Sequence, residues 1–150
     1  MDIKHKEIYK FAEEIFPICR SITGEGARRT LGLIQNHIPL KIYEVPTGTH
    51  AFDWEIPREW NINDAYVLDP DGNKIINFKE NNLHIVNYSI PIEKELDLEE
   101  LQKHLYSIPE QPNAIPYVTS YYEPRWGFCI THKQRQRLRE GKYKVCIDTS

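Results

Sequence analysis

The sequence contains no apolar run near the roughly 20 residues that a helix needs to cross a bilayer. Cysteine is scarce, because the 150 residues include three widely spaced cysteines and no Cys-x-x-Cys pair. An odd, scattered set is less typical of a disulfide framework or a zinc knuckle than of reduced thiols in a cytoplasmic protein. The net charge is −3, so the total charge does not favour binding to nucleic acid or to anionic lipid.

Metal-binding motifs are also missing. The six histidines include no His-x-His and no His-Glu-x-x-His motif, and no stretch supplies the three or four converging ligands that zinc requires. Asp69, Asp71, Asn73 and Glu80 have the spacing of a calcium loop, but Lys74 stands where such a loop needs glycine. A hairpin turn explains the same residues, and the charged N-terminus lacks the apolar core of a signal peptide.

The length suits one globular domain, with 40% hydrophobic and 27% charged residues. Two amphipathic helices are predicted near the N-terminus, over residues 6–16, ended by Pro17, and over residues 27–37. Their apolar residues recur at helical spacing: Ile8, Phe11, Ala12 and Ile15, then Ala27, Leu31, Ile34 and Ile38. A helical hairpin is therefore the predicted opening of the fold.

The loop between these helices carries Cys19, Arg20 and Ser21. Cys19 is either a nucleophile, if a histidine lies beside it in space, or a buried and inert thiol. Arg20 and Ser21 either bind an anion at the start of the second helix or belong to a plain connecting loop.

A strand-rich middle from about 47 to 130 completes an α+β fold, with a further helix and strand at the end. Strands are predicted over 40–45, 51–57 and 83–89, and a hairpin joins 65–68 to 74–78. Asp97 begins a short helix to about 105, and 107–116 is a stiff proline-rich connector. Thr131 caps a helix over 132–140, and the last strand runs from 143 to 148.

Aromatic residues concentrate between Pro116 and Cys129, in a stretch predicted to be an extended strand and turn. It contains Tyr117, Tyr121, Tyr122, Arg125, Trp126 and Phe128. Such side chains fill cores, and Tyr, Trp and Arg also dominate recognition surfaces. Because residues alternate between the two faces of a strand, we expect this stretch to be divided between core and surface.

Four segments, residues 15–26, 52–62, 83–89 and 121–129, closely resemble a known prokaryotic family. The most specific strings are Asp53-Trp54-Glu55-Ile56-Pro57 and Tyr122-Glu123-Pro124-Arg125-Trp126. In order, and over nearly the whole chain, the sequence is similar to the N-terminal portion of zinc aminopeptidases with an M28-like catalytic domain, of the DUF4910/DUF2172 type.

This resemblance implies that residues 1–46 are the N-terminal segment of a peptidase-like domain and that 47–130 form a strand-rich domain inserted into it. Residues 131–150 would be the return helix and strand, cut short of the natural end. The family's zinc-binding residues lie further along. Zinc is therefore implied for the full-length hydrolase, while this chain alone is expected to be inactive, with no metal ligand and no catalytic residue.

The resemblance also implies candidate contributions to the rim of the substrate cleft from Cys19, Arg20, Ser21, Tyr121, Tyr122, Arg125 and Trp126. The expected partners are the remainder of the peptidase domain and a peptide substrate, not nucleic acid or a membrane. The alternative is an independent module that binds a peptide or carbohydrate through residues 116–129. An exposed apolar face on the first two helices would favour the fragment, and burial of that face would favour a complete domain.

Overall fold

The computed structural model describes residues 3–150, with side chains from Lys6 onward. Helices and mainly antiparallel sheets alternate along the chain, so the predicted α+β fold class is confirmed. The chain forms two compact units, Met1–Asn61 (unit 1) and Ile62–Ser150 (unit 2).

Unit 1 begins with the predicted helical hairpin, formed by α1 (Ile3–Ile15) and α2 (Glu25–Gln35). Pro17 follows the end of α1, as expected for a residue that removes a backbone donor. The Phe11 ring meets the His37 ring edge-on, with centroids 4.6 Å apart. This contact links α1 to the residues that follow α2.

The apolar face of this hairpin is largely open to solvent. Ile8 is 69% exposed and Ile38 is 52% exposed, while Phe11 and Ile34 are half-buried. These four residues line a groove of about 870 Å³ with Glu7, Lys10, Glu14 and His37. The apolar faces of the two helices are therefore only partly buried among the described residues, which is the outcome expected of a fragment.

After α2 the chain of unit 1 is mostly extended. The strands β1 (His50–Ala51) and β2 (Trp54–Glu55) pair in an antiparallel hairpin. The strand predicted over 40–45 is wrong for this structure, because within the described residues no other segment pairs with it. Trp60, near the end of the unit, is buried.

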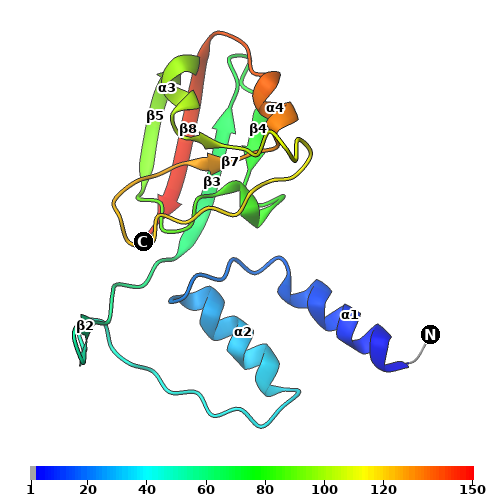
Figure 1. Cartoon of the computed structure of the whole chain (residues 1–150), viewed down its shortest axis with the longest axis vertical. Coiled ribbons are helices and arrows are strands. Elements are labelled where there is room, and N and C mark those ends of the chain that lie inside the picture. Colours follow the sequence, from blue (N-terminus) through cyan, green and yellow to red (C-terminus); the bar gives the residue numbers. More distant parts are fainter. Residues whose placement is uncertain (1–2) are drawn as a thin grey trace. The chain divides into compact units, whose positions relative to one another are not determined.

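Unit 2 is built on a four-stranded antiparallel sheet with the order β4-β3-β8-β5 (Figure 1). Its strands are β3 (Ile62–Leu68), β4 (Lys74–Asn77), β5 (Ile92–Asp97) and β8 (Lys142–Thr149). The predicted hairpin between β3 and β4 is confirmed, and so is the last strand. β8 lies between β3 and β5, so the final strand of the chain is central to the sheet.

One face of this sheet carries the core of unit 2. The register places Val67 opposite Val145 and Ala65 opposite Ile147, and all four side chains are buried. Figure 1 shows β7 and the chain on either side of it crossing in front of the sheet. The other face carries alternating polar residues, the usual pattern for an antiparallel sheet with one solvated side.

The elements of unit 2 outside this sheet are η1 (Asn82–His84), α3 (Leu98–Gln102), β6 (Leu105–Tyr106), β7 (Phe128–Cys129) and α4 (His132–Gln136). The strand predicted over 83–89 is wrong. That stretch forms η1 and isolated bridges, because its backbone bonds to two different segments, Ile85 to Phe128 and Asn87 to Thr119. β5 was not predicted, because Lys94 stands between Ile92 and Leu96 and interrupts the alternation of apolar and polar residues. β6 pairs in parallel with β7.

The two predicted helix caps have different outcomes. At α4, Thr131 and Gln134 form the complete capping box, although the helix ends at Gln136 rather than near residue 140. At α3, Asp97 is the N-cap residue, but its side chain makes no capping hydrogen bond. Its carboxylate instead forms an ion pair with Lys142 on β8, at 2.8 Å.

Candidate functional site

The candidate residues fall into two groups. Cys19, Arg20 and Ser21 lie in unit 1, in the loop between α1 and α2. Tyr121, Tyr122, Arg125 and Trp126 lie in unit 2, between β6 and β7.

Cys19 is a half-buried free thiol. Burial raises the pKa of this thiol to about 11, while the adjacent Arg20 opposes that rise to a smaller extent. The thiolate is the nucleophilic form of cysteine, so at neutral pH Cys19 is protonated and chemically quiet. The geometry therefore favours the inert thiol over the nucleophile.

We expect iodoacetamide at pH 8 to leave Cys19 and Cys129 unmodified in the folded chain. Burial also raises the pKa of Cys129, to about 12. A thiol that titrates near 11 is only about one part in a thousand ionised at this pH. Mass spectrometry after timed alkylation checks the prediction, and the urea-denatured chain is the control. Rapid labelling of Cys19 in the folded chain would contradict the inert assignment.

Arg20 and Ser21 are engaged in bonds that hold the loop. The Arg20 Nη1 donates to the carbonyl oxygen of Ile15 at 2.5 Å, at the C-terminal end of α1. Ser21 Oγ donates to the carbonyl of Thr23 and also lies 3.3 Å from the carbonyl oxygen of Trp60. These side chains satisfy backbone groups at a helix end and in a turn, which is a structural role.

The N-terminal end of α2 is capped by a side chain that is distant in the sequence. Glu25 N donates to Asn61 Oδ1 at 2.7 Å, so a side chain occupies one of the amides that an anion would use. Gly24 has φ 107°, and a Cβ there would lie 2.5 Å from the carbonyl oxygen of Trp60. A Cβ on Gly26 would lie 1.9 Å from the carbonyl oxygen of Cys19. Both glycines are thus needed for close backbone contact.

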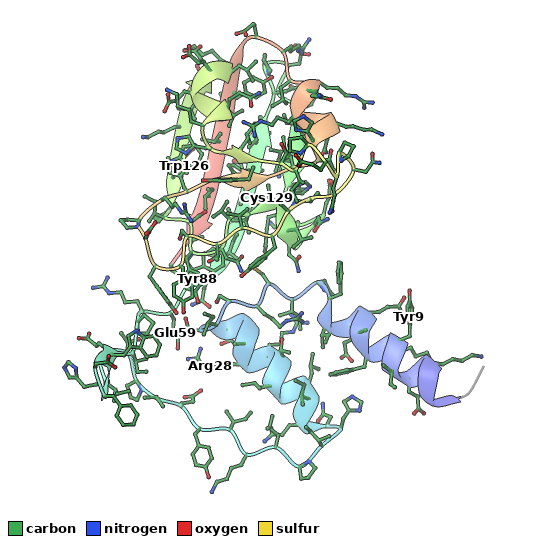
Figure 2. All side chains as sticks on the ribbon, viewed as in Figure 1. Tyr9, Arg28, Glu59, Tyr88, Trp126 and Cys129 are labelled. Carbon is green, nitrogen blue, oxygen red and sulfur yellow. The ribbon has the colours of Figure 1, made fainter. Side chains whose placement is uncertain are left out.

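An ion-pair cluster around Arg28 adds to this arrangement, and Figure 2 shows Arg28 and Glu59 facing each other. The guanidinium donates to both Glu59 oxygens, with Nη1 3.1 Å from Oε2, and through Nε to Glu44 at 3.0 Å. Hydrogen bonding to Arg28 lowers the pKa of Glu59, and hydrogen bonding to Glu59 raises the pKa of Arg28. The cluster is exposed, so it orients segments more than it stabilises them.

In unit 2, three tyrosines have left-handed backbone conformations. Tyr88, Tyr121 and Tyr122 have φ values of 67°, 48° and 70°. The rings of Tyr88 and Tyr122 are 4.5 Å apart with their hydroxyls at 3.3 Å, and Tyr121 meets Tyr122 edge-on at 5.3 Å. Such conformations are costly for bulky residues and tend to occur at functional sites.

The loop that carries Tyr121 and Tyr122 is anchored by two side-chain hydrogen bonds. The buried Ser120 donates its hydroxyl to the carbonyl of Tyr88 at 3.1 Å. Arg125 Nη2 donates to the carbonyl of Thr119 at 2.7 Å, yet the Arg125 side chain stays exposed. Tyr121 is 61% exposed. Tyr121 and Arg125 are therefore exposed to solvent on a loop that these two hydrogen bonds anchor.

Trp126 differs from its neighbours, because it is only 8% exposed. Its ring stacks on His104, with centroids 3.6 Å apart and planes 14° apart, and it meets Phe128 edge-on. Figure 2 shows Trp126 and Cys129 among the side chains that fill unit 2. The indole of Trp126 thus belongs to the core of this unit.

Among the side chains of residues 6–150, no three His, Cys, Asp or Glu groups gather in a way that would hold a metal ion. Buried His84 bonds through Nδ1 to the carbonyl of Cys129 at 2.7 Å, and His132 bonds through Nδ1 to Ser107 at 3.0 Å. Asp69 Oδ1 accepts from the amides of Asp71 and Asn73, which makes it the turn residue of the β3–β4 hairpin. None of the described helices has the length and apolar character of a membrane span.

Sequence reasoning missed Asn61, Arg28 and Tyr88 as site residues. Asn61 and Arg28 act through partners 36 and 31 positions away, so no local spacing points to them. Tyr88 lies in a segment that was expected to be a regular strand. Only its position within the string Asn87-Tyr88-Ser89, which also belongs to the family resemblance, offered a signal.

The fold and these networks define an α+β module whose described residues hold loops and helix ends in place and form no metal centre. The family described as "Domain of unknown function (DUF2172)" matches residues 59–150. The chain belongs to this family. The match covers all of unit 2 and three residues before it.

Two relatives come from Clostridium acetobutylicum. One is described as a "Putative polysaccharide biosynthesis protein with aminopeptidase-like domain" and is 53% identical over 144 residues, which are 96% of this chain and 33% of that protein. The other is a crystal structure described as a "putative peptidase", 52% identical with a TM-score of 0.93, over 97% of this chain and 34% of that one. The chain thus spans about a third of the length of the relatives it matches.

Proposed function

We propose that this chain is the N-terminal, non-catalytic part of a zinc-dependent aminopeptidase-like protein of the M28-like, DUF4910 type. In the whole protein, unit 1 contributes the first elements of the peptidase-like domain, and unit 2 shapes or covers the active-site cleft. The reaction of the whole protein is hydrolysis of the peptide bond next to a free amino terminus. The names of the two relatives support a peptidase-like assignment.

The observation that carries this proposal is the open apolar face of α1 and α2. The groove of about 870 Å³ has an apolar floor of Ile8, Phe11, Ile34 and Ile38. A contiguous exposed apolar surface of this kind marks a contact site rather than a solvated helix face. It matches the expectation for a fragment, since a complete domain would bury these residues.

Zinc is implied by the family resemblance, but the described residues of this chain do not fit it. No ligand group gathers there, and the histidines of unit 2 serve structural hydrogen bonds. The role proposed for this chain is to position, cover and recognise.

Among the cleft candidates, we propose that Tyr121 and Arg125 reach the substrate, and that Tyr122 supports Tyr121 through the edge-on contact of their rings. Tyr121 and Arg125 are exposed on a strained and well-anchored loop, and a single bond to Thr119 leaves further guanidinium donors for a ligand. Cys19, Arg20 and Ser21 contribute by holding the loop that precedes α2. Trp126 contributes by packing. The free thiols Cys19, Cys129 and Cys146 support a cytoplasmic location.

The proposal is tested with a chimera in which this chain replaces the matching third of the Clostridium acetobutylicum protein. We expect the chimera to bind zinc and to release amino-terminal residues from peptides, and the 150-residue chain to do neither. Arg125→Ala in the chimera is expected to raise KM about tenfold with little change in kcat, since it removes ground-state binding. Metal analysis and peptide turnover are the measurements.

Arg20→Ala serves as the matched control, because its guanidinium is bonded to the end of α1. We expect it to lower stability slightly and to leave KM unchanged. A chimera without zinc and without peptidase activity would contradict the proposed function. Unchanged KM and kcat in both arginine variants would remove this chain from substrate recognition.

A second candidate function is an independent module that binds a peptide or carbohydrate through residues 116–129. The exposed Tyr121 and the strained backbone around it favour this reading, and one relative is named for polysaccharide biosynthesis. Specific binding of a ligand by the 150-residue chain alone, lost in Tyr121→Ala, would support it over the fragment.

A further inference from the structure

The loop that carries Tyr121 and Arg125 contains a tight turn built from unusual residues. Glu123 N donates to the carbonyl of Ser120 at 3.1 Å, which closes a four-residue turn. Its two central residues, Tyr121 and Tyr122, both have positive φ values, 48° and 70°, as in a type I′ turn. Asparagine and glycine normally occupy such positions, because a bulky side chain strains the backbone there. The turn therefore keeps two tyrosines at a cost in stability, and strain of this kind tends to cluster at functional sites.

Thr119 links the two ends of this turn. Its hydroxyl oxygen accepts from Tyr121 N at 3.1 Å, and its carbonyl oxygen accepts from Arg125 Nη2 at 2.7 Å. The Arg125 guanidinium thus lies beside the residue that precedes the turn, although Arg125 belongs to the chain that leaves it. Because both bonds are made to one residue, Tyr121 and Arg125 belong to the same small surface.

Tyr117 brings a hydroxyl group to the same network. Its side chain is 65% exposed, and its hydroxyl oxygen accepts from Nδ2 of buried Asn87 at 3.2 Å. Asn87 is fixed in turn, because its backbone forms a bridge with Thr119. An amide NH₂ group can only donate, so the hydroxyl proton of Tyr117 is left to donate to a group outside this pair. The network therefore positions the Tyr117 hydroxyl as a hydrogen-bond donor at the surface.

Arg125 has no carboxylate partner among the described side chains. Arg28 and Arg139 form ion pairs with acidic residues of this chain, whereas none of the ion pairs of the described residues includes Arg125. Within residues 105–131 no other residue is basic. A guanidinium has five N–H groups, and the bond to Thr119 uses one of them. The remaining donors and the positive charge are available to a ligand.

The chemistry of this surface selects for an acceptor that carries negative charge. A guanidinium is a pure donor, and its planar fork matches the two oxygens of a carboxylate. The Tyr117 hydroxyl adds a further donor, and the exposed Tyr121 ring adds an apolar face for the atoms that adjoin the carboxylate. A peptide offers carboxylates at its C-terminus and on its aspartate and glutamate side chains.

We propose that Arg125, with Tyr117 and Tyr121, forms a subsite that binds a carboxylate of the peptide substrate. This inference rests on the proposed function and names the chemical group that the covering domain selects. An aminopeptidase holds the amino end of its substrate at the reaction centre, so this subsite meets a carboxylate further along the peptide. An extended peptide advances by about 3.3–3.6 Å per residue, so a fixed arginine meets the C-terminal carboxylate at one peptide length only.

Peptide kinetics in the chimera test the subsite. One set of substrates is alanine peptides of increasing length, each with a free and with an amidated C-terminus. The second set is amidated peptides that carry glutamate or glutamine at each position after the first. In at least one set we expect KM to be about tenfold lower for the form with the carboxylate, at similar kcat, because the bond lowers the ground state and the transition state equally.

The two sets distinguish the source of the carboxylate. A preference confined to one length of alanine peptide identifies the C-terminal carboxylate. A preference for glutamate over glutamine in the amidated peptides identifies a side chain. Either result supports the subsite. Because each preference is a ratio of two KM values measured in one protein, it does not depend on the fraction of that protein that is folded.

Substitutions assign the preference to its residues. Arg125→Ala should abolish it, by raising KM about tenfold for carboxylate peptides and leaving KM for the neutral forms unchanged. Arg125→Lys keeps the charge but loses the planar fork, so we expect a preference of about threefold. Tyr117→Phe removes one donor and should reduce the preference about threefold. Lys133→Ala removes an exposed cation outside this loop and is the control, with the preference unchanged.

The outcomes separate the two proposals. Turnover of peptides with equal KM for the carboxylate and neutral forms in both sets would overturn the subsite and leave the proposed function standing. If no peptide is turned over, the proposed function fails, and the subsite fails with it. A preference that survives in Arg125→Ala, or that Lys133→Ala reduces as strongly, would overturn Arg125 as its source. Inhibition by a uronic-acid oligosaccharide that is lost in Arg125→Ala, together with equal KM for all peptide forms, would assign the surface to carbohydrate and overturn the peptide carboxylate.

Discussion

Removal of residues 142–150 is expected to abolish the cooperative folding of unit 2. These residues include β8, which pairs with β3 on one side and with β5 on the other. Without β8, the edge strand β5 has no partner in the sheet, and β3 keeps only its hairpin with β4. Tyr143, Val145 and Ile147, which are each at most 2% exposed, are lost from the core as well.

The expected loss is as large as the whole stability of a typical domain, because three buried side chains are removed together with two strand pairings. Truncating one large buried apolar side chain costs about 2–5 kcal/mol, and a whole domain has about 5–15 kcal/mol in total. Loss of the urea transition and of dispersed amide NMR signals measures the effect. Lys144→Ala and Asp148→Ala, on the exposed face of the same strand, are the controls and should stay within about 0.5 kcal/mol of the parent. A cooperative transition in the truncated chain would contradict the central role of β8.

The parts of the fold that the sequence predicted are those set by local chemistry. The turn residues Asp69 and Gly72 specify the β3–β4 hairpin, because Asp69 bonds to the amides of its own turn and Gly72 has φ 84°. Thr131 and Gln134 specify the start of α4 in the same way. The helices of unit 1 follow from their apolar periodicity.

The parts that the sequence did not predict depend on distant partners. The stretch 83–89 has the composition of a strand, but its backbone is shared between Phe128 and Thr119 and cannot form a regular ladder. The segment 40–45 has the composition of a strand, but it has no strand partner among the described residues. In both cases the intrinsic preference was read correctly, and pairing decided the outcome, as is usual for β structure.

The candidate site was predicted only in outline. The aromatic stretch was expected to divide between core and surface, and the structure places Trp126 and Phe128 in the core and Tyr121 in solvent. The positive φ values of Tyr121 and Tyr122 were not predicted, because bulky residues rarely adopt them. The nearby Tyr88 reaches them from a different segment, which spacing along the chain does not reveal.

Trp126→Ala is expected to lower the free energy of unfolding of unit 2 by about 3–5 kcal/mol. The indole is 8% exposed, stacks on His104 and meets Phe128 edge-on, so alanine would leave a cavity among side chains that cannot all move in. Aromatic pairs also contribute about 0.5–1.5 kcal/mol beyond the area that they bury. Urea unfolding followed by circular dichroism measures the change.

Tyr121→Ala is the matched control from the same stretch, and we expect a change below about 1 kcal/mol because that ring is largely in water. In the chimera, KM should distinguish the two variants in the opposite order from stability. Tyr121→Ala should raise KM with stability retained, while Trp126→Ala should lose stability with KM retained under conditions where the protein stays folded. A stable Trp126→Ala variant with a raised KM would instead place the indole in the cleft and Tyr121 outside it.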